Sequence, residues 1–82
     1  MLKVVEIKIE EIYVPVERRK EIDPQAVEAA AEKVLDDSED RPIQVRVGKG
    51  RYVLVKGINR LEAHKSLGED TIGAYIVAAK RH

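Results

Sequence analysis

Residues Val53–Arg60 read VLVKGINR, and within them the chain passes from a strand pattern directly into a helix pattern. A helix N-terminus presents unpaired backbone N–H groups and a partial positive charge, which together favour an anion. Gly57 allows the backbone to approach a ligand closely, and the planar guanidinium of Arg60 suits phosphate. The stretch therefore predicts a phosphate-binding turn. From the spacing alone, an alternative stays open in which Gly57 only makes a tight turn and Arg60 is a solvated surface residue.

Strand patterns surround this stretch on both sides. Pro42–Val47 and Arg51–Val55 flank the turn residues Gly48-Lys49-Gly50, which predicts a β-hairpin. Val4–Ile9 alternates apolar and charged residues, as in a half-buried strand, and Thr71–Val77 reads as a last strand. The helix that follows Gly57 is expected to end at Gly68, in the left-handed conformation that favours glycine.

A longer helix is predicted from Asp23-Pro24, because an aspartate can cap free N–H groups and proline fits the first helical position. Its expected core face is apolar and its expected outer face is charged. The apolar positions are Val27, Ala30, Ala31, Val34 and Leu35, and the charged ones are Glu28, Glu32 and Lys33. Glu11–Val16 is expected to be extended, and Arg18–Glu21 to be a charged connection. The order of elements predicts one compact α+β domain over residues 1–82.

The composition limits the classes of function. The 82 residues include 15 Lys plus Arg and 15 Asp plus Glu, so the chain lacks the basic excess typical of a domain that grips DNA alone. There is no cysteine, which excludes disulfides, thiolate nucleophiles and cysteine-based zinc sites. The two histidines are far apart in the sequence, so we expect no metal site. No signal-peptide core and no apolar run of membrane length occur, so we expect a cytoplasmic protein without membrane contact.

The segment from Gly57 resembles a signature of the ParB/sulfiredoxin superfamily. ParB proteins have a glycine-glutamate-arginine-arginine run there that binds the triphosphate of CTP. Sulfiredoxins have glycine-cysteine-histidine-arginine, which binds the phosphates of ATP. Pro15, Arg19 and Asp23 match another ParB signature, in which a proline-rich turn leads through arginine to an aspartate that opens a helix. Pro42–Arg46 resembles the proline-isoleucine-x-valine-arginine strand of the same proteins.

The resemblance covers roughly residues 5–77 and implies a fold and a ligand. The implied fold is a small single-domain ParB/sulfiredoxin-like α+β fold, with a mixed sheet and two main helices. The implied ligand is a nucleoside triphosphate, CTP or ATP, bound with Mg²⁺. The implied phosphate-binding residues are Gly57, Ile58, Asn59, Arg60 and Arg19, with the Asn59 amide as one donor.

Three departures from the family patterns alter these expectations. Ile58 stands where sulfiredoxins have their catalytic cysteine, so repair of a sulfinic acid through a thiolate is excluded. Ala26 stands where sulfiredoxins have a phosphate-contacting lysine. Ile58-Asn59 replaces the glutamate-arginine pair of ParB, which removes a further cation.

Several functions stay open at the level of sequence. The domain is a nucleotide-binding switch, with or without hydrolysis or phosphate transfer, or a DNA-associated ParB-like partition or nuclease-type factor acting with partners. The third alternative is a protein-interaction module that has lost the ligand. No residue stands out as a catalytic base, and Glu62 and His64 are open between ligand-related and structural roles. Neutral charge and the absence of a helix-turn-helix counterpart predict weak or no independent DNA binding. A protein partner or a homodimer is compatible with each alternative.

Overall fold

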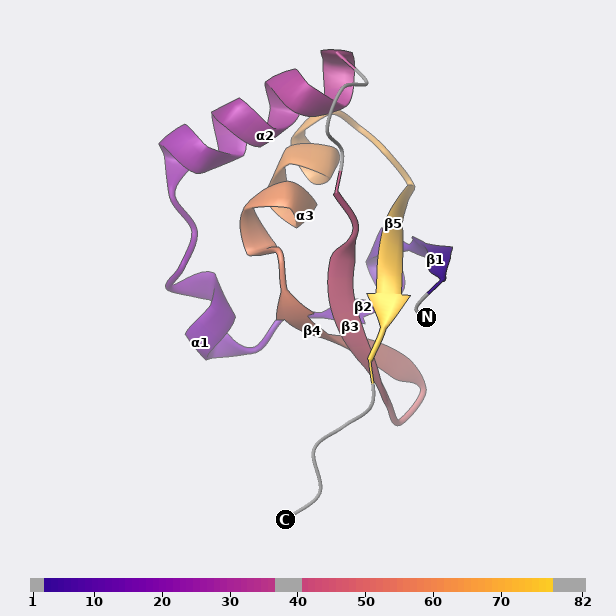
Figure 1. The fold of residues 1–82 in the computed structure, drawn as a ribbon. Helices are drawn as coiled ribbons and strands as arrows, with labels where there is room; N and C mark the ends of the chain where they lie inside the picture. The colour runs from indigo at the N-terminus through magenta and orange to yellow at the C-terminus, as the bar shows by residue number, and fades with distance from the viewer. Residues whose placement is uncertain (1–2, 37–40, 78–82) are drawn as a thin grey trace.

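The computed structural model describes residues 3–36 and 41–77. Figure 1 shows how strands and helices follow one another along the chain. The elements are β1 (Val4–Lys8), the 3-10 turn η1 (Ile9–Glu11), β2 (Ile12–Tyr13), α1 (Val16–Arg19), α2 (Pro24–Asp36), β3 (Ile43–Gly48), β4 (Arg51–Lys56), α3 (Ile58–Ser66) and β5 (Thr71–Ile76).

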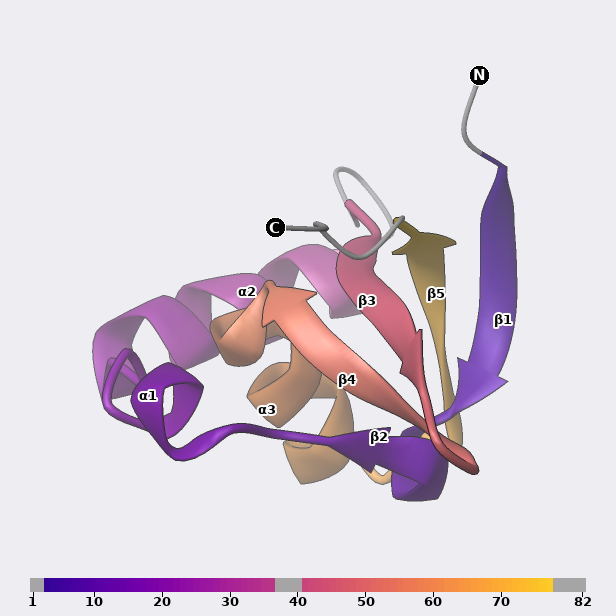
Figure 2. The ribbon, with the colours of Figure 1, turned by 90° about the horizontal axis from the view of Figure 1, so that it is seen from below.

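The strands form one five-stranded mixed sheet in the order β1-β5-β3-β4-β2 (Figure 2). β3 and β4 pair antiparallel across a two-residue turn, Lys49-Gly50, which confirms the predicted hairpin; Gly48, expected in the turn, is the last residue of β3 and pairs with Arg51. β1 pairs antiparallel with β5, whereas β5 pairs parallel with β3 and β2 pairs parallel with β4. The α+β class and the mixed sheet expected from the sequence are therefore confirmed.

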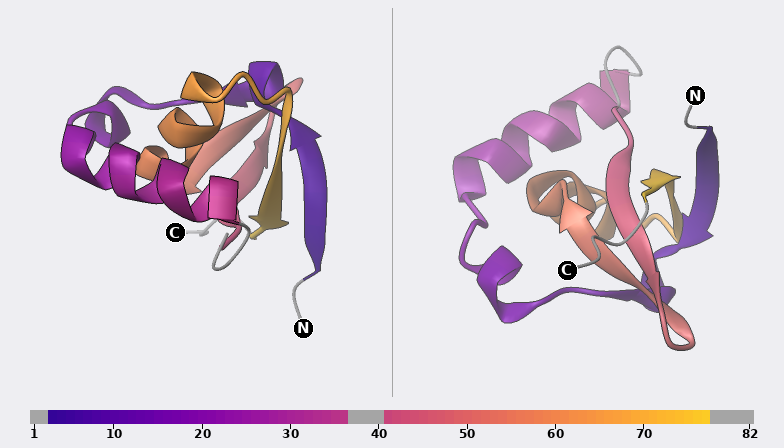
Figure 3. Two further views of the ribbon diagram at one scale, coloured as in Figure 1. Left: turned by 90° about the horizontal axis from the view of Figure 1, so that it is seen from above. Right: turned by 60° about the horizontal axis from the view of Figure 1, so that its bottom comes forward.

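The core lies between one face of the sheet and α3, and α2 packs on the outside against α3 (Figure 3). Leu61 of α3 and Val45 of β3 are fully buried. The helix that covers the sheet is therefore the shorter α3 rather than the longer α2. None of the residues of α2 is buried. The core cluster comprises Ile7, Ile9, Val14, Ile43, Val45, Leu54, Ile58, Leu61, Ile72 and Ala74.

Both predicted helix boundaries are confirmed by their hydrogen bonds. A side-chain oxygen of Asp23 accepts from the N–H of Gln25 at 3.1 Å, and its carbonyl accepts from Val27 at 2.9 Å. The aspartate thus caps α2 as expected. Gly68 has φ 76°, and its N–H donates to the carbonyl of Lys65 at 3.0 Å, which closes α3.

The structure departs from the sequence-based expectation around Pro15. The segment Val16–Arg19 forms one turn of helix, α1, instead of extended chain and a charged connection. The carbonyl of Pro15 accepts from the N–H groups of Arg18 and Arg19, at 3.0 and 3.2 Å, and Arg18 pairs with Glu21 at 2.8 Å. These local bonds hold a turn that hydrophobic periodicity does not reveal.

Two apolar residues near element ends are exposed. Leu35, expected on the core face of its helix, is 74% exposed in the last turn of α2, and Val47 is 63% exposed beside the hairpin turn. Both stand near the ends of their elements, where little packs against them. No helix among residues 3–36 and 41–77 combines the length and apolar character that crossing a membrane requires.

Candidate functional site

The junction between β4 and α3 is built around Gly57. Its φ of 108° lies in the region that glycine adopts readily and other residues avoid. A Cβ atom at this position would lie 2.7 Å from Cγ2 and 3.2 Å from Cα of Ile43. Gly57 is therefore required twice, once for the backbone conformation and once for the close contact with β3.

The N-terminus of α3 is open. No side chain caps it, and the N–H of Leu61 donates to the carbonyl of Gly57 at 3.0 Å. The N–H groups of Ile58, Asn59 and Arg60 precede this bond, and the first N–H groups of a helix have no partner within it. They concentrate the positive end of the helix dipole beside Gly57. This arrangement fits an anion.

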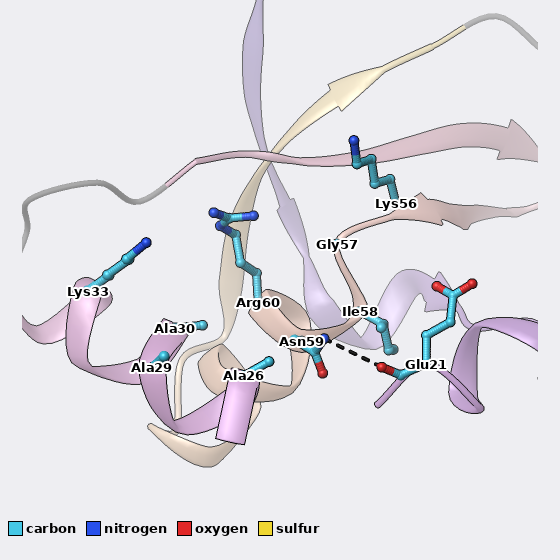
Figure 4. Close-up of a pocket in the computed structure, with 10 residues that line it drawn as sticks. All are labelled: Glu21, Ala26, Ala29, Ala30, Lys33, Lys56, Gly57, Ile58, Asn59 and Arg60. Atoms are coloured by element: carbon cyan, nitrogen blue, oxygen red, sulfur yellow. Dashed lines mark hydrogen bonds between the residues drawn. The ribbon is translucent and has the colours of Figure 1, made fainter. Parts of the chain in front are cut away.

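A cavity of about 360 Å³ opens at this helix start, between α2, the end of β4 and the first turn of α3 (Figure 4). Three cations reach it from three elements: Lys33 from α2, Lys56 from β4 and Arg60 from α3. Glu21 is the one acid among the lining residues that the structure describes. The full lining is Glu21, Ala26, Ala29, Ala30, Lys33, Lys56, Gly57, Ile58, Asn59 and Arg60. We call this cavity the helix-start pocket.

Asn59 has a role that the sequence did not indicate. Its Oδ1 accepts from the N–H of Asp23 at 2.9 Å, and its Nδ2 donates to the carbonyl of Glu21 at 3.5 Å (Figure 4). The side chain therefore ties the first turn of α3 to the chain that leads into α2. The tie uses one of the two N–H donors of the amide, so the donation from Asn59 to a ligand stays a prediction.

The structure brings together four of the five predicted site residues. Gly57, Ile58, Asn59 and Arg60 all line the helix-start pocket, whereas Arg19 does not. Arg19 belongs to α1 and lines a separate cavity of about 340 Å³. That cavity is lined by Ile12, Tyr13, Val14, Arg19, Ile22, Ile58, Glu62 and Lys65. Ile58, the first residue of α3, lines both cavities.

Two cations of the pocket were missed by the sequence analysis. Lys33 is exposed, as expected for the outer face of its helix, but the sequence analysis did not indicate that it lines the pocket together with Ala26 and Ala30. Spacings of three, four and seven residues put these positions on one helix face, and this spacing was the available signal. Lys56 was signalled only by its position directly before Gly57.

The two residues left open on α3 lie away from the helix-start pocket. Glu62 pairs with Lys65 at 3.2 Å and lines the second cavity. His64 is 6% exposed and belongs to the buried side of the helix. Neither residue lines the helix-start pocket. Within residues 3–36 and 41–77, no group of three or more His, Cys, Asp or Glu side chains is placed to hold a metal ion.

The arrangement of a mixed sheet, an outer helix and a glycine-started inner helix defines a class of small α+β domains. The family model of the ParB N-terminal domain matches residues 1–82. The chain therefore belongs to the ParB N-terminal domain family. No curated protein sequence matches it.

Solved structures agree with this assignment. Sulfiredoxin from Arabidopsis thaliana is 30% identical, with a TM-score of 0.81, and the match covers 94% of this chain and 86% of that one. A C-terminally truncated chromosome-partitioning protein ParB from Caulobacter crescentus, solved with CTP-gamma-S, is 22% identical with a TM-score of 0.78. The match covers 95% of this chain and 46% of that ParB chain.

A free serine kinase variant, solved in complex with AMP, is similar in the same way. It is 19% identical with a TM-score of 0.77, and the match covers 93% of this chain and 31% of the kinase. The chain thus spans under half of the ParB structure and about a third of the kinase, so these two matches show the fold. The chain contains no cysteine.

Proposed function

We propose that this domain binds a nucleoside triphosphate in the helix-start pocket, with the phosphates at the N-terminus of α3. The observation that carries the proposal is the meeting of three cations, Lys33, Lys56 and Arg60, at an uncapped helix start. Backbone N–H groups and cations are the two means by which proteins hold phosphate. Nucleotide complexes of structural neighbours, with CTP-gamma-S and with AMP, support the same class of ligand.

The donor set of the pocket fits Mg²⁺ that arrives with the phosphates. Mg²⁺ is commonly held by substrate phosphates, water and one or two carboxylates rather than by a cage of protein ligands. Glu21 is the carboxylate available for this among the described lining residues, and its present partner is Arg18 at 2.8 Å. When bound, the ion would neutralise phosphate charge that the three cations leave unbalanced. Either CTP or ATP satisfies this chemistry.

We propose binding rather than turnover as the function of the pocket. A hydrolase or phosphotransferase needs a group that positions or activates the acceptor. Among the described lining residues, Glu21 is the one side chain of a type suited to that task, and the proposal above already assigns it to Mg²⁺. The remaining lining groups therefore favour a site that holds phosphates.

Isothermal titration tests the proposal with ATP and CTP, each with Mg²⁺ or with EDTA, and with the matching nucleosides. We expect both triphosphates to bind and Mg²⁺ removal to weaken them. Because the proposed contacts are made to phosphates, nucleosides should bind at least about tenfold more weakly, the loss expected from one charge-assisted hydrogen bond. Equal affinity for a nucleoside and its triphosphate would show that the phosphate site is wrongly assigned.

A further inference from the structure

The two edges of the sheet differ in the length of strand that they leave open. The order β1-β5-β3-β4-β2 places β1 at one edge and β2 at the other. β2 has only two residues, whereas β1 has five, and Figure 2 shows β1 outermost, beside β5. A very short edge strand is one of the ways in which proteins avoid pairing with other chains, and β2 fits that pattern. β1 is long enough to accept a further strand.

The backbone of β1 has a definite outward side. The N–H of Ile9, the residue after β1, donates to the carbonyl of Asp70 at 2.9 Å, which continues the register of β1 with β5. Ile9 therefore directs its backbone groups toward β5. Because these directions alternate along an antiparallel strand, Val4, Glu6 and Lys8 direct their N–H and C=O groups toward the free edge.

The side chains of β1 alternate between the core and an exposed, charged face. Ile7 is buried in the core cluster, and its neighbours Glu6 and Lys8 are both exposed on the opposite face of the sheet. Val4 and Val5 are 53% and 40% exposed. A strand added at this edge would therefore cover apolar surface as well as meet one acid and one base.

We propose that a second copy of this chain occupies the edge, with the two β1 strands antiparallel and centred on Ile7, so that Glu6 of each copy faces Lys8 of the other. Opposite charges that face each other across two strands stabilise the pair, and like charges destabilise it. Centring on Glu6 would set the two Glu6 carboxylates against each other. Centring on Val5 would leave Lys8 without an acid opposite it. The charges therefore select the register about Ile7.

The backbone fits the same register. Glu6 and Lys8 are outward-facing residues, so each facing pair can exchange two N–H···O=C bonds, and the pair occurs twice about the two-fold axis. The two five-stranded sheets would then continue as one sheet, with the helices of both copies on the same face.

Charge complementarity extends beyond the paired strands. Lys3 is exposed directly before β1, and pairing about Ile7 carries it toward the segment that follows β1 in the other copy. There the carboxylates of Glu10, Glu69 and Asp70 line a cavity of about 470 Å³. Attraction between the lysine of one copy and the acids of the other favours the same alignment, and salt should screen it.

Pairing at β1 leaves the helix-start pocket open. β5 and β3 lie between β1 and β4, and the pocket borders the end of β4. None of the lining residues belongs to β1. The inference is therefore independent of the proposed nucleotide binding.

Sedimentation equilibrium over a range of protein concentrations tests the pairing, and charge reversal tests its register. We expect a reversible dimer that weakens as salt is raised, because an edge contact is smaller than the standard interface of about 1,600 Å². Glu6→Lys and Lys8→Glu should each weaken the dimer about tenfold or more, since each sets like charges against each other twice. The two changes combined restore opposite charges and should return the Kd to within about threefold of the original. A domain that stays monomeric overturns the proposal, as do single reversals without effect or a combined variant no tighter than the single ones.

A proline substitution tests the backbone bonds. Lys8 has φ −73°, which proline adopts, and its N–H faces outward, so Lys8→Pro removes an edge donor and no bond to β5. Lys8→Ala removes the same charge, keeps the N–H and is the matched control. We expect Lys8→Pro to abolish the dimer and Lys8→Ala to weaken it less. Thermal melting of the monomers checks the fold, and should Lys8→Pro melt early, the charge reversals decide. A dimer that survives in folded Lys8→Pro overturns the proposal.

Discussion

Arg60 lies in the first turn of α3, where its guanidinium and the free N–H groups of the helix start can act on the same anion. Arg60→Ala should weaken triphosphate binding roughly 10- to 150-fold, from the approximately 1.5–3 kcal/mol of a hydrogen bond to a charged group. The fold should survive, because the burial of α3 depends on Ile58, Leu61 and Ala63 and because alanine favours helix.

Titration together with thermal melting checks this expectation. Arg46→Ala is a matched control, since Arg46 is exposed on β3 and does not line the pocket. If Arg60→Ala keeps the full rise in Tm that the nucleotide gives to the unaltered domain, Arg60 is a surface residue and the phosphate site loses its main side chain.

Gly57 shows which part of a site a sequence can reveal. The need for glycine where a strand turns directly into a helix is a local matter of backbone conformation, and VLVKGINR was enough to predict it. The contact of 2.7 Å that any Cβ would make with Ile43 depends on the pairing of β3 with β4. That contact belongs to the folded sheet and could not be derived from the residues around the turn.

At the scale of elements, the pocket depends on the position of α2 relative to α3. The sequence predicted both helices, because caps and periodicity are local, but it did not reveal that Lys33 borders the pocket or that the Asn59 amide joins the first turn of α3 to the start of α2. Asn59 and Asp23 are 36 positions apart, and their bond exists only once the two helices pack. The surroundings of a charged side chain at the edge of a helix face depend on how the helix packs against its neighbours. The residue pattern of one helix does not contain that information.

The tie made by Asn59 can be tested by removing it. Asn59→Ala deletes the bonds to Asp23 and Glu21, and should lower the free energy of unfolding by about 1–2 kcal/mol. In a domain of this size that corresponds to a fall in Tm of about 5–15 °C. Triphosphate affinity should fall as well, because Lys33 is no longer held opposite the start of α3.

Gln25→Ala is the matched control for this variant. Gln25 is exposed in the first turn of α2, and the bond it makes to Asp23 uses its backbone N–H, which alanine keeps. Chemical denaturation and nucleotide titration of both variants distinguish the outcomes. Equal stability of the two variants would show that the Asn59 bonds do not hold the helices together.

At the scale of the whole molecule, the thin core and the charged pocket have a common consequence. A chain of 82 residues without Phe or Trp buries a small core, so a ligand that binds only the folded state should raise its stability measurably. The cations that we propose hold the ligand come from α2, β4 and α3. A phosphate bound there would therefore connect three elements of the fold.

The distribution of charge over the molecule also predicts how it behaves toward DNA. Fifteen cationic side chains are matched by 15 acidic ones, so the domain as a whole has no excess with which to release counterions from a duplex. Lys33, Lys56 and Arg60 are gathered at one pocket, where a bound triphosphate would neutralise them. We therefore expect the isolated domain to bind duplex DNA only in the non-specific range of about 10⁻⁴–10⁻⁶ M at physiological salt, and more weakly still when nucleotide is present.

A mobility-shift titration with and without ATP and Mg²⁺ measures both effects, with Arg60→Ala as the variant that should lose the nucleotide effect. A sub-micromolar, sequence-dependent shift would instead favour a partition factor that reads DNA directly, because affinity of that kind requires base contacts that the pocket cations do not supply.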